Sequence, residues 1–132
     1  MPDEERAALE RQHEDLRGLS DRLGKALARS PLERGPVAEA LAGLIAVLFQ
    51  HEEAESAFLR ARLKGSKAGE RTLQAMENEH VSLLALVKDI QIVMGHPELY
   101  SLDHLSGLAG RFRVVLQAHL ELEEKHVYGR PA

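Results

Sequence analysis

The chain contains no cysteine and no tryptophan among its 132 residues, and only three phenylalanines and two tyrosines. Without cysteine it forms no disulfide, thiolate metal site or thiol nucleophile, so any bound metal must have nitrogen and oxygen ligands. The few aromatic residues provide neither the aromatic and basic interleaving of nucleic-acid binders nor an obvious electron relay. A pocket in this protein should therefore be lined by leucine, valine and methionine.

Long apolar runs and a strong charge of one sign are also missing. No segment approaches the roughly 20 apolar residues that span a bilayer, and residues 1–11 are charged, unlike a signal peptide. The formal net charge is −4, which points to no nucleic-acid or membrane partner and identifies no protein partner. We therefore expect a cytoplasmic protein. Its length and 44% hydrophobic content predict one domain over residues 1–132.

Glycine and proline divide the chain into four segments of helical length, and none has the alternation of a strand. The predicted helices cover about residues 3–29, 35–65, 67–94 and 101–128. Gly35 and Pro36 suit the start of the second helix, Gly65 suits its end, and Ser101 suits the N-cap of the fourth. Apolar residues recur at steps of three and four, which indicates one buried face per helix. The predicted fold class is all-α, an antiparallel up-down-up-down four-helix bundle.

A histidine interrupts the apolar face of every predicted helix. These histidines are His13, His51, His80 and His119. Glu55 and Glu123 each follow a histidine by four residues and so share its helix face. An unpaired buried polar group costs about 1–3 kcal/mol, so this concentration of imidazoles and carboxylates indicates bound metal ions.

The rise of a helix tests whether the four histidines meet. At about 1.5 Å per residue, His13 lies roughly 24 Å from the first connection and His51 roughly 22 Å beyond it. The same arithmetic places His80 level with His51, and His119 within about one turn of His13. We therefore expect all four imidazoles in one layer of the bundle.

The order His, His-x-x-x-Glu, His, His-x-x-x-Glu resembles the hemerythrin-like, or HHE cation-binding, domain family. The matching stretches are residues 12–16, 51–55, 79–80 and 119–124. The resemblance covers nearly the whole chain and implies two non-heme iron ions joined by an oxo or hydroxo group. The implied ligands are His13 and His51 on one iron, His80 and His119 on the other, and Glu55 and Glu123 as bridges. Imidazole and carboxylate suit iron, and manganese or zinc would also fit.

One expected family ligand is missing. Oxygen-carrying hemerythrins typically have a second histidine one turn from the one on the third helix, whereas this chain has Met76 and Leu84 beside His80. Glu77 is a candidate replacement, because it lies three residues before His80. Without a fifth imidazole, we expect a site less confined to reversible oxygen binding and more reactive toward oxygen or peroxide.

Four further residues lie near the predicted site. Glu124 competes with Glu123 for the last bridge, since some family members place the acidic residue five positions after the histidine. Glu52 and Glu53 are expected to be solvated. Resemblance to some iron-sensing members of the family implies the alternative that Glu52, next to His51, reaches a metal. His126 is expected to be exposed or to support the ligands from outside, although its spacing from His119 and Glu123 also allows it to point inward and add a ligand.

Three functions follow as hypotheses. The first is a non-heme di-iron protein that binds O2, peroxide or a similar small ligand as a carrier, sensor or scavenger. The second is an enzyme on the same scaffold that decomposes peroxide or uses O2 as an oxidant. The third is a metal-free helical interaction module whose histidines respond to pH. A ferritin-like site is disfavoured, because its Glu-x-x-His motif occurs only at residues 77–80.

Overall fold

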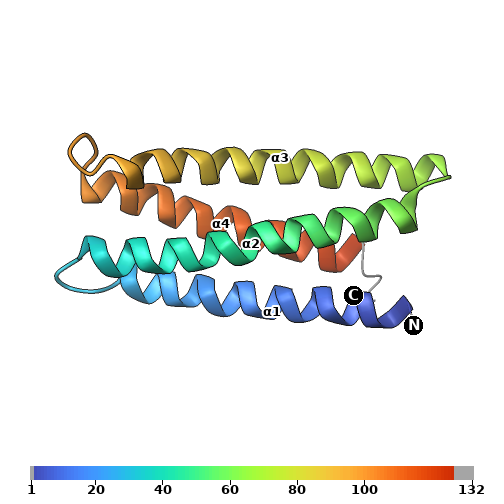
Figure 1. Ribbon diagram of the computed structural model, residues 1–132, viewed down its shortest axis with the longest axis horizontal. Coiled ribbons are helices and arrows are strands. Elements are labelled where there is room, and N and C mark those ends of the chain that lie inside the picture. The colour runs from blue at the N-terminus through green and yellow to red at the C-terminus, as the bar shows by residue number, and fades with distance from the viewer. Residues whose placement is uncertain (1, 127–132) are drawn as a thin grey trace.

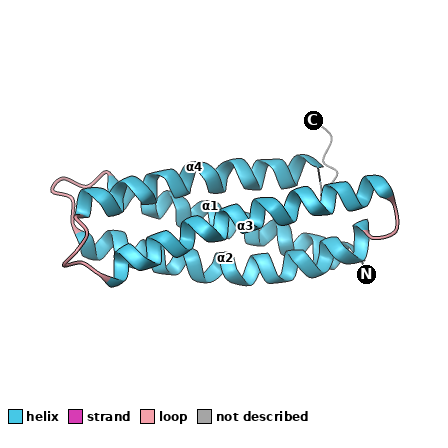
Figure 2. Ribbon diagram, turned by 90° about the horizontal axis from the view of Figure 1, so that it is seen from above, coloured by secondary structure: helices cyan, strands magenta, loops and turns pink. Residues whose placement is uncertain are grey.

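The computed structural model describes residues 2–126 of the chain, with burial described for residues 4–125. Its helices are α1 (Pro2–Leu27), α2 (Arg34–Leu63), α3 (Lys67–Gly95) and α4 (Leu102–His126), and the described residues include no strand. The α1–α2 and α3–α4 connections lie at one end of the bundle and the α2–α3 connection at the other (Figures 1 and 2). The prediction of an up-down-up-down four-helix bundle is confirmed.

The helices begin and end within a few residues of the predicted positions. Helix α2 begins at Arg34, one residue before the predicted start, and Pro36 lies in its first turn, where a missing N–H is tolerated. Gly65 follows the helix with a φ of 105°, a left-handed conformation that favours glycine. Ser101 caps α4 as predicted, because its Oγ accepts a hydrogen bond from the His104 N–H at 3.1 Å.

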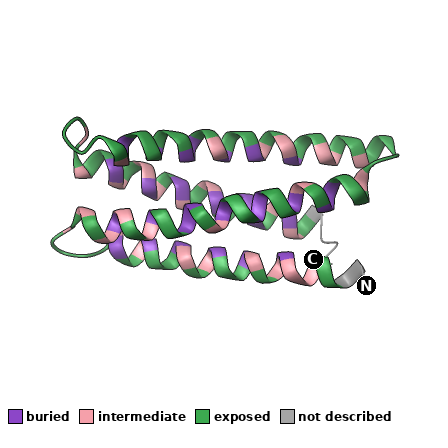
Figure 3. Ribbon diagram, viewed as in Figure 1, coloured by how far each residue is buried: buried purple, intermediate pink, exposed green. Residues whose placement is uncertain are grey.

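Buried positions recur along all four helices (Figure 3). Most of them are apolar, and they form two clusters on either side of one polar layer. The larger apolar cluster extends toward the α1–α2 and α3–α4 connections and includes Leu23, Leu44 and Phe112. The smaller cluster lies toward the α2–α3 connection. It consists of Leu9, Phe58, Leu59 and Met76, with Leu63, Leu73 and Leu122 packed against it. The buried polar residues occupy the level between the two clusters, so close packing above and below holds their backbones in place.

None of the described helices combines the length and the apolar composition that crossing a bilayer requires.

Candidate metal centre

The six side chains singled out from the sequence lie together in the polar layer. They are His13 on α1, His51 and Glu55 on α2, His80 on α3, and His119 and Glu123 on α4. The most exposed of them, His80, retains only 6% of its accessible surface. The residues on α2 and α4 reach the same layer in pairs, because residues four apart lie on one face of a helix.

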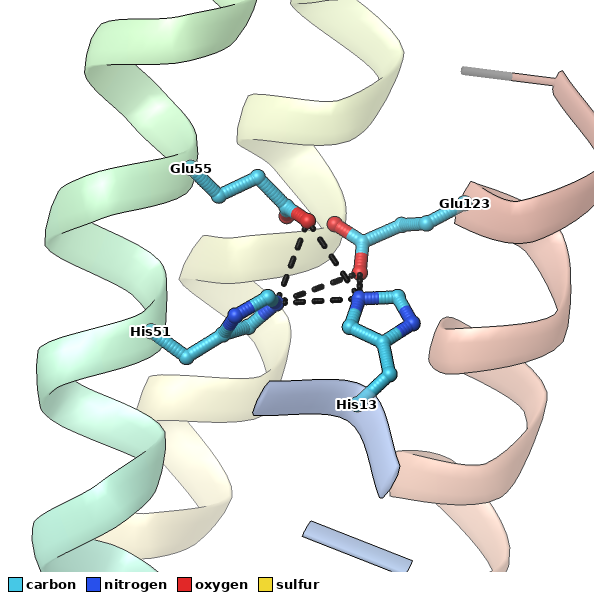
Figure 4. Close-up of side chains that lie close together, drawn as sticks. All are labelled: His13, His51, Glu55 and Glu123. Carbon is cyan, nitrogen blue, oxygen red and sulfur yellow. Dashed lines mark hydrogen bonds and ion pairs between the residues drawn. The ribbon is translucent and has the colours of Figure 1, made fainter. Parts of the chain in front are cut away.

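The histidines of α1 and α2 form the first half of the layer. The Nε2 atoms of His13 and His51 are 3.1 Å apart. Glu55 Oε2 lies 3.1 Å from the Nε2 atom of His51, and Glu123 Oε1 lies 3.2 Å from that of His13. Figure 4 shows the two rings and the two carboxylates converging on one point. Four ligand atoms from three helices are thus close enough to share one cation.

The histidines of α3 and α4 form the second half and repeat this geometry. The rings of His80 and His119 meet edge to face with centroids 4.9 Å apart, against 4.7 Å for the first pair. Glu55 Oε1 lies 3.0 Å from the Nε2 atom of His80, and Glu123 Oε2 lies 3.2 Å from that of His119. Each carboxylate therefore directs one oxygen to each half of the layer.

Hydrogen bonds at the outer ring nitrogens orient the first pair of histidines. His13 Nδ1 is 2.9 Å from a carboxylate oxygen of Glu124, and His51 Nδ1 is 2.7 Å from the amide oxygen of Gln12. Because both oxygens are acceptors, both Nδ1 atoms donate, which leaves the two Nε2 atoms as lone-pair acceptors. Two such acceptors 3.1 Å apart repel each other unless a cation or proton lies between them.

Glu52 overturns the expectation that it is solvated. Its exposed fraction is 5%, whereas its neighbour Glu53 is exposed as predicted. Its Oε2 lies 2.7 Å from His80 Nδ1, and its Oε1 lies 3.4 Å from His119 Nε2. Burial raises the pKa of Glu52, but contacts with His119 and His80 outweigh burial and leave that pKa below its usual range. Helix α2 packs against all three other helices, so its buried face is wider than one stripe.

The buried carboxylates and imidazoles shift each other's protonation. Burial raises the pKa of Glu55, but contacts with His13, His51 and His80 hold that pKa well below its usual range. Burial lowers the pKa of His80, but contacts with Glu52 and Glu55 raise it to about 9. Without a metal, His80 would therefore carry a proton at neutral pH, close to the point where a cation would sit.

Glu123 and Glu124, the two alternatives for the last bridge, occupy different places. Glu123 is fully buried inside the layer. Glu124 lies at its edge, where it contacts His13 Nδ1 and pairs with Arg17. Burial raises the pKa of Glu124, but Arg17 and His13 keep it below the ordinary value. Of the two, it is Glu123 whose carboxylate oxygens lie near the inner nitrogens of both histidine pairs.

The other candidate ligands lie outside the layer. Glu77 faces Arg60 at 3.4 Å on the surface. Met76, which stands where a fifth histidine was considered, packs in the smaller apolar cluster with Phe58. The side chain of His126 lies outside the described residues.

Several buried polar atoms in the layer lack an aligned hydrogen bond within the described part of the chain. They are both ring nitrogens of His119, Oε1 of Glu123 and both carboxylate oxygens of Glu52. Leaving such atoms unsatisfied costs about 1–3 kcal/mol each, whereas a cation would satisfy the ones that face the centre. The donor set of neutral imidazoles and carboxylates fits iron, manganese or zinc.

Comparison with known proteins gives one match. Residues 5–130 match the family model described as the hemerythrin HHE cation binding domain. No curated protein and no solved structure matches the chain.

Proposed function

Because the chain belongs to the hemerythrin HHE cation-binding domain family, we propose that its buried layer holds two non-heme iron ions and binds O2 or a related small species. One observation carries the proposal. Glu55 and Glu123 each present one oxygen to the His13 and His51 pair and the other oxygen to the His80 and His119 pair. Carboxylates divided in this way hold two cations close together without full charge repulsion.

The proposed ligands divide into two sets. His13 and His51 would bind one ion, His80 and His119 the other, and Glu55 and Glu123 both. Two iron ions in such a site supply redox chemistry and affinity for O2 or peroxide. The chain's own residues orient the imidazoles and keep bulk water away from the layer, because apolar clusters cover it on both sides.

The position of Glu52 supports a second candidate function, in which the iron centre reacts with peroxide or O2. It provides a carboxylate beside His80 and His119, in a centre with no fifth histidine at Met76. An anionic donor stabilises the higher charge of oxidised iron more than a neutral imidazole does. We therefore propose that the oxidised form is favoured over a long-lived oxygenated form, which suits a sensor, a scavenger or a peroxide-decomposing enzyme.

The test is metal analysis of protein loaded with ferrous iron, together with its ultraviolet-visible spectrum. We expect two irons per chain with near-ultraviolet charge-transfer bands, and loss of both in the double variant His51→Ala, Glu55→Ala. The matched control is His104→Ala with Glu53→Gln, which changes an exposed histidine and an exposed glutamate. If the wild-type protein binds no iron, manganese or zinc, the metal-free module with pH-responsive histidines is favoured instead.

Stopped-flow measurements then separate binding from catalysis. Repeated consumption of peroxide by the iron-loaded protein would identify an enzyme. A ferrous protein whose oxygenated form persists for hours would contradict the role proposed for Glu52.

A further inference from the structure

A chain of three charged or polar side chains runs from the surface of the bundle to the metal centre. Arg17 on α1 donates to both carboxylate oxygens of Glu124 on α4, at 2.5 and 2.8 Å. Glu124 Oε2 in turn accepts from His13 Nδ1 at 2.9 Å. The side chains of Arg17 and Glu124 are 32% and 20% exposed, whereas that of His13 is 1% exposed.

The spacing of these residues makes the contact rigid. His13 and Arg17 are four residues apart and lie one above the other on α1. One carboxylate from α4 therefore contacts two successive turns of α1. The arginine contact is bidentate, a planar geometry that fixes the orientation of the carboxylate as well as its distance.

The other imidazoles of the layer have no such support. The outer nitrogen of His51 meets the neutral amide of Gln12, and that of His119 has no hydrogen-bond partner among the described residues. His80 faces the carboxylate of Glu52, which also approaches His119 and has no arginine partner in the described contacts. His13 is thus the imidazole that donates to a carboxylate, Glu124, whose own orientation is fixed by an arginine.

We propose that Glu124 and Arg17 are positioning residues for the metal position of His13 and His51. This inference rests on the proposed function. Glu124 holds the proton on His13 Nδ1 and the ring in the orientation that directs Nε2 into the layer, and Arg17 fixes Glu124. A carboxylate behind a ligating imidazole also strengthens the imidazole as a donor. Stability alone explains the contact poorly, because partly exposed ion pairs contribute little to folding.

The proposal predicts an effect on one metal position of the two. Loss of a hydrogen-bond partner behind a metal ligand typically weakens metal binding about 10–100-fold. Glu124→Ala should weaken the His13 and His51 position by that factor and leave the His80 and His119 position as it was. Arg17→Ala should have a smaller effect of the same kind, because Glu124 remains.

The experiment is titration of the full chain with Co2+, followed by calorimetry and by the visible bands of bound cobalt. The variants are Glu124→Ala, Glu124→Gln, Arg17→Ala and Arg17→Lys. The control is Arg60→Ala, which breaks another ion pair between helices at the surface. We expect one of two binding events to weaken in Glu124→Ala, with altered bands for that event. Glu124→Gln keeps an acceptor for His13 and should recover part of the affinity.

A double-mutant cycle and the unfolding of the cobalt-free proteins distinguish positioning from general stability. Glu124→Ala should cause no further loss of cobalt affinity in a His13→Ala background. Wild-type affinity and bands in both Glu124→Ala and Arg17→Ala would overturn the proposal while leaving the proposed function standing. Equal weakening of both events, in step with lower stability of the cobalt-free protein, would also overturn it. If Glu124→Ala fails to fold, Arg17→Lys replaces it as the test, because it keeps the charge but loses the bidentate contact. Weaker binding at one position in Arg17→Lys would support the proposal, and unchanged binding would overturn it. A wild-type chain that binds neither cobalt nor iron would instead refute the proposed function.

Discussion

The two halves of the polar layer contain the same residue types but are held differently. In the first half, Gln12 and Glu124 each orient one histidine from outside the layer. In the second half, Glu52 lies against both rings, and His119 Nδ1 has no hydrogen-bond partner among the described residues. Identical side chains therefore need not make equivalent positions. We expect the first position to be preorganised and the second to adapt to its cation.

Loss of Glu55, which both halves share, should weaken metal binding most. Glu55→Ala removes one carboxylate oxygen from each histidine pair, so both metal positions should be lost together. The loss should exceed the factor of about 10–100 typical of residues behind the ligands. Calorimetric titration with Co2+ checks this, and Glu53→Gln on the exposed face of α2 is the control. Retention of either position at full affinity would contradict the shared role of Glu55.

A smaller effect, confined to the second half, is expected from Glu52→Ala. The variant removes the carboxylate beside His80 and His119 but leaves the contacts of His13 and His51 unchanged. We expect about 10–100-fold weaker binding at one position, and slower reaction of the iron-loaded protein with peroxide. Stopped-flow kinetics and metal stoichiometry measure both. An equal loss at both positions would show that the two halves are not independent.

The smallest effect is a pH dependence that originates in the second half. Contacts with carboxylates raise the pKa of His80 from 6.5 to about 9, so their contribution to metal-free stability is complete below pH 6.5. That contribution is lost as the pH rises through about 9, so the thermal midpoint of metal-free protein should fall over this range. Metal affinity should instead rise with pH over this range, because metal binding displaces the proton from His80.

Glu52→Gln sharpens this test. It removes one of the carboxylates that raise the pKa of His80, so the fall in thermal midpoint should be smaller and should end at a lower pH. Glu53→Gln should leave the profile unchanged. A wild-type midpoint that does not fall between pH 6.5 and 9 would contradict the contribution of His80.

Hydrophobic periodicity was sufficient to predict the helices and the layer. His51 and Glu55 replace apolar residues at the same phase as Leu48 and Phe58, and that phase fixes which face they occupy. The burial of Glu52 was not predictable in this way. Its burial depends on how far α3 and α4 wrap around α2, which is a tertiary property.

The contacts behind the histidines were beyond sequence reasoning for a related reason. Arg17 and Glu124 are 107 positions apart in the chain, and Gln12 is 39 positions from His51. Their pairing requires the relative rotation of two helices and the rotamers of long side chains, neither of which local spacing determines. The sequence presents Glu124 only as a rival to Glu123. The structure separates their roles, because adjacent residues on a helix point in different directions.

The unequal thickness of the two apolar clusters has a kinetic consequence. On the side of the α2–α3 connection, the buried cover of the layer within residues 4–125 consists of Leu9, Phe58, Leu59 and Met76. Local opening of the helices at this end would be the route by which an ion is released to solution. Release of iron into excess chelator should then proceed at a rate independent of chelator concentration. Met76→Ala should accelerate it, whereas Leu44→Ala in the thick end should not.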